Sequence, residues 1–582
     1  MIDLREVKGF QNITKQMIKK WTPIPADENK ITELEELLQV NHVQARLFLR
    51  QGIYSKLEAD RFLNPSLDQL HDPFRMDGMI RALERIQQAI DQEEKILIYG
   101  DYDVDGVTSV VLLFSFFQHF SNKLDYYIPD RYKEGYGVSM QGIDYASQNG
   151  ISLIISVDCG IKAVEQVAEA KSRNIDFIIC DHHLPEEKLP DAIAILDPKK
   201  PACSYPYKEL SGCGIAFKLA QAYGTANGWV LEEFKPLLDL VVVSIACDIV
   251  PMTGENRMLA HFGLQQINTR PRMGLAALIE LSSKKEKLKI EDIVFGIGPM
   301  INAAGRIGDA KQAVRLLLSE DSAVTADYAR LLKQRNQLRK EFDKSIVAEA
   351  IAIHENTAGW EEQKSIVLFH PEWHKGVIGI AASRIVDRYY RPAIILTESN
   401  GKAVGSARSI PGFDIYETIK SCSHLLENFG GHQHAAGLTL AIENVPQFKN
   451  AFEEAVQARH SSPAKEPEIK YFAELSLNEL TADFWKALQA FAPFGPLNRN
   501  PVFASRNVVD AGYSQLLKEK HLRLHIYQKD SFSVKAIAFN QEVHFSKIKS
   551  QAFDICYTIQ ENHWRDKVTL QLNVKDIKFE NF

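Results

Sequence analysis

Hydrophobic and polar positions along the chain change their period near residue 93. Before that point, apolar residues recur at three- and four-residue intervals, as in LEELLQVNHVQARLFLRQGI, which predicts amphipathic helices. From Lys95 onward, short β-rich apolar runs alternate with helix-like stretches that begin near Val107, Ser139, Lys162 and Leu184. The runs are KILIYG, LDYYIP, SLIISV, IDFIIC and IAIL. This alternation predicts an α/β fold with a doubly wound parallel sheet that is buried on both faces.

The rest of the chain changes character several times. The pattern is mainly helical up to Asp309, and a long charged helix without Gly or Pro follows. A second, smaller α/β pattern ends in the Gly-rich turn FGGHQHAAG, and the polar stretch SSPAKEPE predicts a linker before alternating, barrel-like segments. We therefore expect a helical lead-in over 1–92, a first α/β domain over 93–320, a spacer helix over 321–358, a second α/β domain over 359–460 and a β-barrel over 466–582.

Composition places the chain among ordinary globular proteins. It has 582 residues, of which 45% are hydrophobic and 25% charged, enough for several cores. The first residues lack the apolar core of a secretory signal, and the longest apolar stretches are shorter than the roughly 20 residues that span a bilayer. We therefore expect a cytoplasmic protein. The net charge of −7 confines any nucleic-acid contact to a local patch. The seven cysteines include no CxxC pair, which excludes a zinc ribbon.

Three aspartates follow the first predicted strand at alternate positions. The segment IYGDYDVDGVTS places Asp101, Asp103 and Asp105 where sheets of this class bind ligands, at the carboxyl end of a strand. A calcium loop of the EF-hand type also opens D-x-D-x-D-G, but its twelfth position should be glutamate and is Leu112 here. A strand also precedes the segment where a helix would be required. Taken alone, the triplet could equally form only a capped turn.

Further acids and histidines follow other apolar runs. SLIISV delivers Asp158, IDFIIC delivers Asp181, His182 and His183, and Asp248 follows LLDLVVVSIAC. Carboxylates that converge at one sheet edge repel one another unless a proton or cation relieves them. Carboxylate and imidazole ligands without thiolate suit manganese or magnesium better than structural zinc. We therefore expect two Mn²⁺ or Mg²⁺ ions, about 3.5–4 Å apart, that support hydrolysis of a phosphodiester or anhydride.

Several motifs resemble a known family. GDYDVDG, SVDCG, CDHH and IACDIVP are similar to the four successive motifs of the DHH phosphoesterase superfamily. RYKEGYGV, INAAGRIGDA, GSARSIPGFD and FGGHQHAAGL extend the resemblance to the RecJ family of bacterial single-strand-specific exonucleases, from about residue 45 to the end. The resemblance implies a DHH domain, a DHHA1 domain and a carboxy-terminal OB-fold. It also implies 5′→3′ degradation of single-stranded DNA in repair and recombination.

The resemblance also implies roles for individual residues. The expected metal ligands are Asp101, Asp103, Asp105, Asp158, His182 and Asp248. The expected catalytic residues are Asp103, Asp158, Asp181 and His183. Arg306, Ser406 and Arg408 would form a 5′-phosphate pocket, with Gly431 and His432 as further phosphate contacts. Without the family, these arginines could be surface ion-pair residues, and the glycines a plain strand turn. Tyr471, Phe472, Tyr513 and Trp564 are candidates for base stacking in the OB-fold, although core packing also suits them.

Three positions depart from the family pattern, and two other functions remain open. Met300 stands where arginine is usual, Leu497 where glycine is common, and Arg499 where proline or an acidic residue is common. A phosphodiesterase for short oligonucleotides or cyclic dinucleotides could use the same metals, but it would not need the residues after Ser461. A non-catalytic DNA-binding scaffold should have lost ligands, whereas each expected position here can ligate. The expected partners are single-stranded DNA and a helicase or single-strand-binding protein, with no membrane and a monomeric state.

Overall fold

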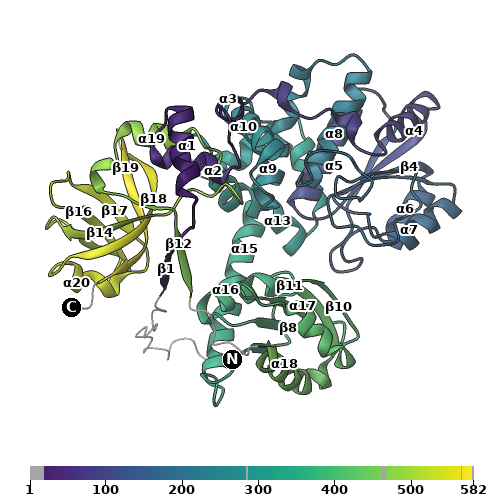
Figure 1. The fold of residues 1–582 in the computed structure, drawn as a ribbon. Coiled ribbons are helices and arrows are strands. Elements are labelled where there is room, and N and C mark those ends of the chain that lie inside the picture. The colour runs from purple at the N-terminus through teal and green to yellow at the C-terminus, as the bar shows by residue number, and fades with distance from the viewer. Residues whose placement is uncertain (1–18, 283–285, 460–466, 565–566, 580–582) are drawn as a thin grey trace. The chain divides into compact units, whose positions relative to one another are not determined.

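The computed structural model describes residues 19–282, 286–459, 467–564 and 567–579, and of His563, Trp564 and Lys567 only the backbone. The chain divides into two compact units (Figure 1). The large unit comprises residues 56–456 and 491–499, and the carboxy-terminal unit comprises residues 1–55, 457–490 and 500–582. The described residues of the predicted lead-in are therefore shared between the two units.

The first sheet of the large unit has five parallel strands in the order β3-β2-β4-β5-β6. Their bounds are β2 (Lys95–Gly100), β3 (Leu124–Tyr127), β4 (Ile151–Val157), β5 (Asp176–Cys180) and β6 (Ala194–Leu196). The apolar side chains of β2 and β4 are almost completely buried because helices cover both faces. The predicted parallel sheet is confirmed, and burial on both faces explains why its strands read as continuous apolar runs.

Helices follow the first strands as the sequence predicts, with one exception. The helices α5 (Val104–Phe117), α6 (Met140–Gln148) and α7 (Val164–Ser172) begin close to the predicted positions. The stretch from Leu184, however, contains no helix, so that prediction is wrong. Pro185 and Pro190 explain the difference, because proline lacks a donor N–H and disfavours helical backbone in the residue before it.

Most of the remaining large unit is helical up to a long central helix. The helices are α3 (Lys56–Leu63), α4 (Met79–Asp91), α8 (Gly212–Ala226), α9 (Leu238–Cys247), α10 (Gly254–Thr269), α11 (Met273–Leu281), α12 (Ile290–Asp292), α13 (Gly298–Ile307) and α14 (Lys311–Leu318). The predicted spacer helix is α15 (Ser322–Glu355), and the Asp321 carboxylate caps it by accepting hydrogen bonds from the Ala323 and Val324 amides. It contacts α11, α13 and α14 and also α16 of the second sheet region.

The second sheet has the order β10-β11-β9-β8-β7, in which only β7 and β8 pair in parallel. Its elements are β7 (Ile366–Phe369), α16 (Ile378–Tyr389), β8 (Ala393–Ser399), β9 (Lys402–Arg408), α17 (Ile415–Ser421), β10 (Asn428–His432), β11 (Ala435–Ala441) and α18 (Val445–Arg459). The Gly-rich segment FGGHQHAAG is more than a turn, because it forms most of the hairpin β10–β11. A Cβ atom on Gly431 would lie 2.3 Å from the Ala435 carbonyl oxygen, so the hairpin requires glycine there.

The carboxy-terminal unit holds a seven-stranded, largely antiparallel sheet. Its strands are β13 (Ala473–Glu474), β14 (Phe503–Asp510), β15 (Gln515–Leu517), β16 (His521–Tyr527), β17 (Val534–Ala538), β18 (Phe553–Trp564) and β19 (Lys567–Lys578). An additional pairing between β14 and β16 curls the sheet toward a barrel. The predicted OB-like fold is confirmed.

Two helices and one short strand from the amino-terminal segment belong to the carboxy-terminal unit. The helices are α1 (Glu28–Leu38) and α2 (His42–Arg50). Strand β1 (Lys20–Pro23) pairs in parallel with β12 (Glu468–Tyr471), although the sequence analysis expected only helices there. The segment KWTP is too short for any periodicity to show, and its partner lies far away in the sequence. Among the described residues, no helix is long and apolar enough to cross a membrane.

Candidate active site

The carboxyl ends of three neighbouring strands carry the predicted acids and histidines. Asp101 follows β2, Asp158 follows β4, and Asp181, His182 and His183 follow β5. Helix α5 begins very close to the end of β2, because a Cβ atom on Gly106 would lie 2.5 Å from the Asp101 carbonyl oxygen. A glycine is therefore required at the position where the chain turns from strand into helix.

Two groups of potential ligands share His182. Asp158, His182 and His183 form one group, and Asp105, His182 and Asp248 form the other, each with ligand atoms within 4.8 Å of one another. His182 Nε2 lies 3.2 Å from Asp158 Oδ1, 3.6 Å from Asp248 Oδ2 and 3.9 Å from Asp105 Oδ2. The structure thus brings side chains from β4, β5, α5 and the end of α9 to one place. We refer to these five residues as the ligand cluster.

The Asp105 carboxylate is held by groups that the sequence analysis did not identify. It accepts hydrogen bonds from the backbone N–H groups of Gly212 and Cys213 at the start of α8, at 2.7 and 2.8 Å. It also accepts one from the Ser244 hydroxyl at 2.7 Å. A helix N-terminus favours negative charge, so α8 and α9 fix the orientation of this carboxylate. The segment SGCG, in which Ser211 caps α8 and Gly212 begins it, is the sequence signal from which this helix start could have been located.

Asp103 and Asp101 lie beside the ligand cluster. Asp103 caps α5, and both hydrogen bonds from the Asp105 and Gly106 amides go to its Oδ1, which leaves Oδ2 available to a metal ion. The Asp101 side chain is only 1% exposed. Burial and the neighbouring acid raise the pKa of each, with Asp105 acting on Asp103 and Asp103 acting on Asp101.

Asp181 positions His183. Its Oδ1 lies 2.7 Å from His183 Nδ1 and accepts hydrogen bonds from the His182 and His183 amides, while Oδ2 accepts one from Ile161 N. Burial opposes ionisation of Asp181, but the hydrogen bond and charge of His183 outweigh it and lower the Asp181 pKa to about 2. Adjacent to them, the Tyr136 hydroxyl lies 3.1 Å from His183 Nε2 and 3.2 Å from the Asp158 carbonyl oxygen. Tyr136 belongs to the segment RYKEGYGV and is not among the site residues predicted from the sequence.

The charge balance of the ligand cluster fits a bound cation. Burial, together with Asp105 and Asp103, raises the pKa of Asp158 and raises that of Asp248 to about 9. Burial lowers the His182 pKa to about 4, so the imidazole is neutral and can ligate. Within the described part of the chain, both ring nitrogens of His182 are buried without a hydrogen-bond partner. A divalent ion would satisfy the nitrogen that faces the acids and offset the repulsion among them, so these residues fit manganese or magnesium.

The residues of the predicted phosphate pocket, Arg306, Ser406 and Arg408, lie close to one another around the start of α16. A Cβ atom on Gly379, in α16, would meet Arg408 Nη2 and Ser406 Oγ, each at 2.9 Å, and Arg408 Nη1 donates to Ser406 Oγ. Arg306 Nη1 donates a hydrogen bond to the carbonyl oxygen of Gly376, which lies three residues before Gly379. Burial lowers the Arg306 pKa to about 10, with Arg131, Arg339 and Arg408 adding repulsion. A bound anion would offset the repulsion among these buried guanidinium groups. Arg131 is an addition that the sequence analysis missed.

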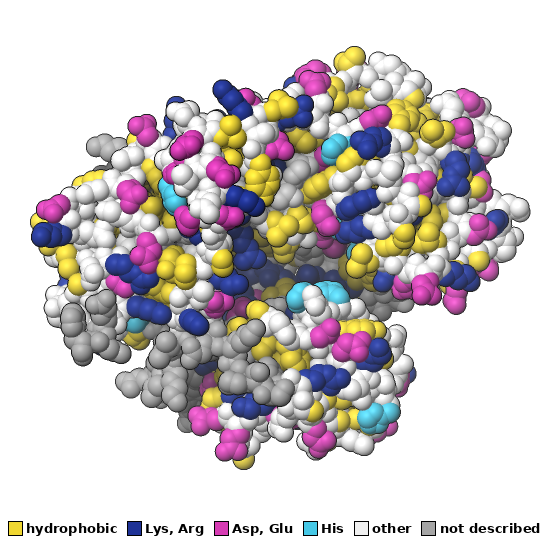
Figure 2. Space-filling model, in the orientation of Figure 1, with side chains coloured by type: hydrophobic (Ala, Val, Ile, Leu, Met, Phe, Trp, Pro, Cys, Tyr) yellow, Lys and Arg dark blue, Asp and Glu magenta, His cyan; other side chains and the backbone are white. Residues whose placement is uncertain are grey.

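Other predicted residues have more varied environments. Gly431 and His432 lie on the edge strand β10, and His432 is near enough to Arg408 for that charge to contribute to its lowered pKa. Met300 is 3% exposed and packs in the core, so it cannot replace a phosphate-binding arginine. Lys and Arg side chains are interspersed with Asp and Glu on the face in Figure 2, as the overall charge suggests.

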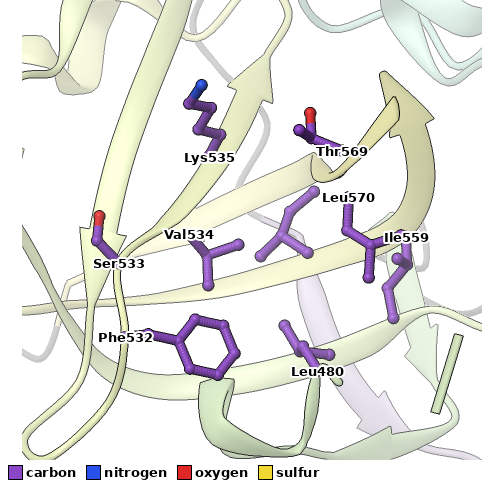
Figure 3. Close-up of a pocket in the computed structure, with 9 residues that line it drawn as sticks. Leu480, Phe532, Ser533, Val534, Lys535, Ile559, Thr569 and Leu570 are labelled. Carbon is purple, nitrogen blue, oxygen red and sulfur yellow. The ribbon is translucent and has the colours of Figure 1, made fainter. Parts of the chain in front are cut away.

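The candidate base-stacking residues of the carboxy-terminal unit divide by exposure. Tyr471 and Phe472 are 8% and 2% exposed, and Arg46 and Arg50 cover the Phe472 ring, so both are core residues. Tyr513 is 71% exposed and remains a candidate, while the Trp564 side chain lies outside the described residues. The same unit has a pocket of about 230 Å³, lined mainly by Leu480, Phe532, Val534, Ile559, Leu570 and Leu572 (Figure 3). Lys535 is its charged residue, so it cannot house the hydrolytic chemistry.

Changing Tyr136 to phenylalanine tests the contact with His183. The substitution removes the hydroxyl and keeps the ring beside Tyr102 and His183. We expect kcat on single-stranded DNA to fall about 5-fold, the value of one hydrogen bond of about 1 kcal/mol. Steady-state kinetics of Tyr136→Phe, beside the surface variant Tyr54→Phe, would measure this. An unchanged kcat would remove the hydroxyl from the site.

Comparison with known proteins identifies the family of this chain. Family models match residues 95–245 (DHH family, N-terminal domain), 362–458 (DHHA1 domain) and 473–576 (RecJ OB domain). The single-stranded-DNA-specific exonuclease RecJ of Bacillus subtilis is 38% identical over 96% of this chain and 70% of its own length. That of Haemophilus influenzae is 33% identical over 92% of this chain and 95% of its own. The chain belongs to the RecJ family.

Solved RecJ structures agree with this assignment. The crystal structure of RecJ in complex with Mn²⁺ from Thermus thermophilus covers 97% of this chain and 80% of that chain, with a TM-score of 0.82 and 26% identity. A second, of the exonuclease RecJ bound to manganese, covers 69% of this chain and 97% of that chain, with a TM-score of 0.60 and 30% identity. A further Thermus thermophilus RecJ structure is in complex with Mg²⁺. The expectation of manganese or magnesium as cofactor is confirmed for this RecJ chain.

Proposed function

We propose that this RecJ chain hydrolyses single-stranded DNA stepwise from its 5′ end, with two Mn²⁺ or Mg²⁺ ions at the ligand cluster. Family membership makes the chain a single-stranded-DNA-specific exonuclease. The observation that carries the two-ion proposal is the pair of ligand groups that share His182. The two groups mark two adjacent ion positions, and a carboxylate between them, unlike the single lone pair of His182 Nε2, could bridge two ions about 3.5–4 Å apart.

We assign the ligand residues as follows. Asp105, His182 and Asp248 would hold one ion, and Asp158 and His183 would contribute to the other, with Asp103 Oδ2 and Asp101 close by. When bound, the ions neutralise the phosphate and lower the pKa of a water molecule that attacks phosphorus. The chain's own part is to orient these ligands. Asp105 is fixed by Ser244 and the start of α8, and His183 is fixed by Asp181.

The polarity of degradation follows from the arginine pocket. Arg306, Ser406 and Arg408 would receive the terminal 5′-phosphate, because guanidinium groups and a hydroxyl match phosphate oxygens. The pKa of Arg306 is affected by Asp103 as well as by Arg408, so the pocket and the ligand cluster are near neighbours. A strand anchored by its terminal phosphate would therefore place an early phosphodiester at the ions.

The carboxy-terminal unit favours a long strand over a dinucleotide. An OB-like sheet is a common platform for single strands, and a dinucleotide phosphodiesterase would have no use for it. We further propose that the enzyme acts as a monomer in the cytoplasm, and that a helicase or a single-strand-binding protein supplies its strand. Gly431 and His432, on an edge strand beside Arg408, would contribute further phosphate contacts.

The proposal is tested with end-labelled DNA. Single-stranded oligonucleotides that carry either a radioactive 5′-phosphate or a 3′ fluorophore with an unlabelled 5′-phosphate, and matched duplexes, are incubated with the protein and Mn²⁺. We expect single strands to release labelled mononucleotide at once from the 5′-labelled substrate, while the 3′-labelled substrate shortens gradually. Blunt duplexes and reactions with EDTA should stay intact. Early release of the 3′ label would refute the polarity, and equal degradation of duplexes would refute the strand preference.

A further inference from the structure

Ile249 has a backbone conformation that its side chain makes unfavourable. It follows Asp248 directly after α9 and has φ of 59°. This left-handed region suits glycine, and a β-branched residue there is an outlier. The side chain is 65% exposed, so core packing does not compensate for the strain. Strain beside a ligand residue indicates a functional contact rather than a structural one.

Leu497, on a neighbouring segment, also combines a positive φ with an exposed apolar side chain. The residues Gly495 to Asn498 form a turn closed by the bond from Asn498 N to the Gly495 carbonyl. Leu497 occupies its third position with φ of 59°, where glycine is preferred after proline, and it is 69% exposed. Met252 N donates to the Pro496 carbonyl at 2.8 Å, so this turn is bonded to the segment that begins at Ile249.

A third exposed apolar side chain directly follows a residue of the ligand cluster in the sequence. Leu184 directly follows His183 and is 71% exposed. We call Leu184, Ile249 and Leu497 the apolar rim. Exposed leucine or isoleucine is normal when scattered, but here two members adjoin ligand residues directly and two adopt backbone conformations that glycine would take without strain.

The chemistry of the substrate identifies what the apolar rim would contact. The ligand cluster and the arginine pocket suit phosphate, whereas the apolar parts of a DNA strand are its bases. In a duplex the base faces are covered by stacking, and in a single strand they are free for apolar contact of any sequence. Building on the proposed function, we propose that the apolar rim packs against unpaired bases next to the scissile phosphate and so contributes to the preference for single strands.

Glycine substitutions separate this role from a structural one. Ile249→Gly and Leu497→Gly relieve strain, so we expect each to raise Tm slightly, by about 1–2 °C. We expect each to lower kcat/KM on single-stranded DNA about 10-fold, mainly through KM, because a base contact is lost. Ile249→Leu keeps an apolar side chain and should retain near-wild-type kcat/KM. The control Asn174→Gly has φ of 59° in the wild type, lies at the opposite end of β5, and should leave kcat/KM unchanged.

Abasic DNA supplies the decisive comparison. Strands of equal length carry tetrahydrofuran residues in place of the first nucleosides next to the 5′-phosphate. The wild type should cleave them about 10-fold less efficiently than normal strands, and Ile249→Gly should show no further loss. An equal loss with the variant on both substrates would place the contact on the backbone and overturn the inference. So would a lowered Tm with unchanged kinetics.

Failure of this inference differs from failure of the proposed function. If the wild type showed no manganese-dependent cleavage of any strand, the proposed function would fall. If the wild type cleaved normal strands and Ile249→Gly matched it on both substrates, only the role of the apolar rim would be refuted.

Discussion

Replacing Asp103 with asparagine is expected to lower kcat/KM on single-stranded DNA by about 10³-fold or more while the protein remains folded. Asparagine retains the side-chain oxygen that accepts hydrogen bonds from the Asp105 and Gly106 amides, so the cap of α5 persists. The carboxylate charge that would contact a metal ion through Oδ2 is lost. Several kcal/mol of transition-state stabilisation by a bound ion corresponds to this factor.

The controls separate catalysis from folding. Asp191→Asn removes an exposed carboxylate that pairs with Lys171 and should change neither kcat/KM nor Tm. Tm measured with EDTA and with Mn²⁺ gives a second readout, since an ion that binds only the native state raises Tm. We expect the Mn²⁺-induced rise to be reduced in Asp103→Asn, and Tm in EDTA to equal or exceed that of the wild type because one buried like charge is gone. Normal degradation by this variant would exclude Asp103 from the mechanism.

The first sheet and the acids at its edge were predictable because the apolar runs mark the strands and the parallel order of the strands brings the residues after them to one edge. Strands buried on both faces read as continuous apolar runs, and parallel strands deliver the residues after them to one edge. Asp101, Asp158 and Asp181 are therefore located by their place after KILIYG, SLIISV and IDFIIC. The long helix α15 was visible for a similar reason, since no Gly or Pro interrupts it.

The parts that sequence could not supply depend on contacts between distant segments. Strand β1 exists only through its pairing with β12, hundreds of residues later. Ser244 supports Asp105 from the interior of an apolar helix, where a serine has no distinguishing pattern. Arg131 and Tyr136 lie in a loop whose path no periodicity encodes. After His183 the sequence predicts a helix that the structure lacks. The helical spacing there is misleading, because Pro185 and Pro190 disfavour a helix.

Replacing Arg408 with glutamine is expected to lower kcat/KM about 10²-fold on strands with a 5′-phosphate and to change it little on strands with a 5′-hydroxyl. Two charge-assisted hydrogen bonds from one guanidinium, together about 3 kcal/mol, account for this factor. Arg408→Lys should recover only part of the loss, since lysine keeps the charge without the planar fork. Arg388→Gln, whose native partner is Glu355, controls for charge removal at the surface of the same region.

The stability of these variants distinguishes an anion pocket from a structural arginine. Burial lowers the pKa of Arg408, and Arg131 adds repulsion, so the guanidinium is held charged in an unfavourable place without an anion. Arg408→Gln should therefore be at least as stable as the wild type in phosphate-free buffer, and inorganic phosphate should stabilise the wild type more than the variant. A structural arginine would behave in the reverse way, because its removal would strand the Ser406 hydroxyl and the Ala407 carbonyl that it now contacts. Lower Tm together with equal losses on both kinds of 5′ end would therefore assign Arg408 to the fold and leave the recognition of the strand end to other residues.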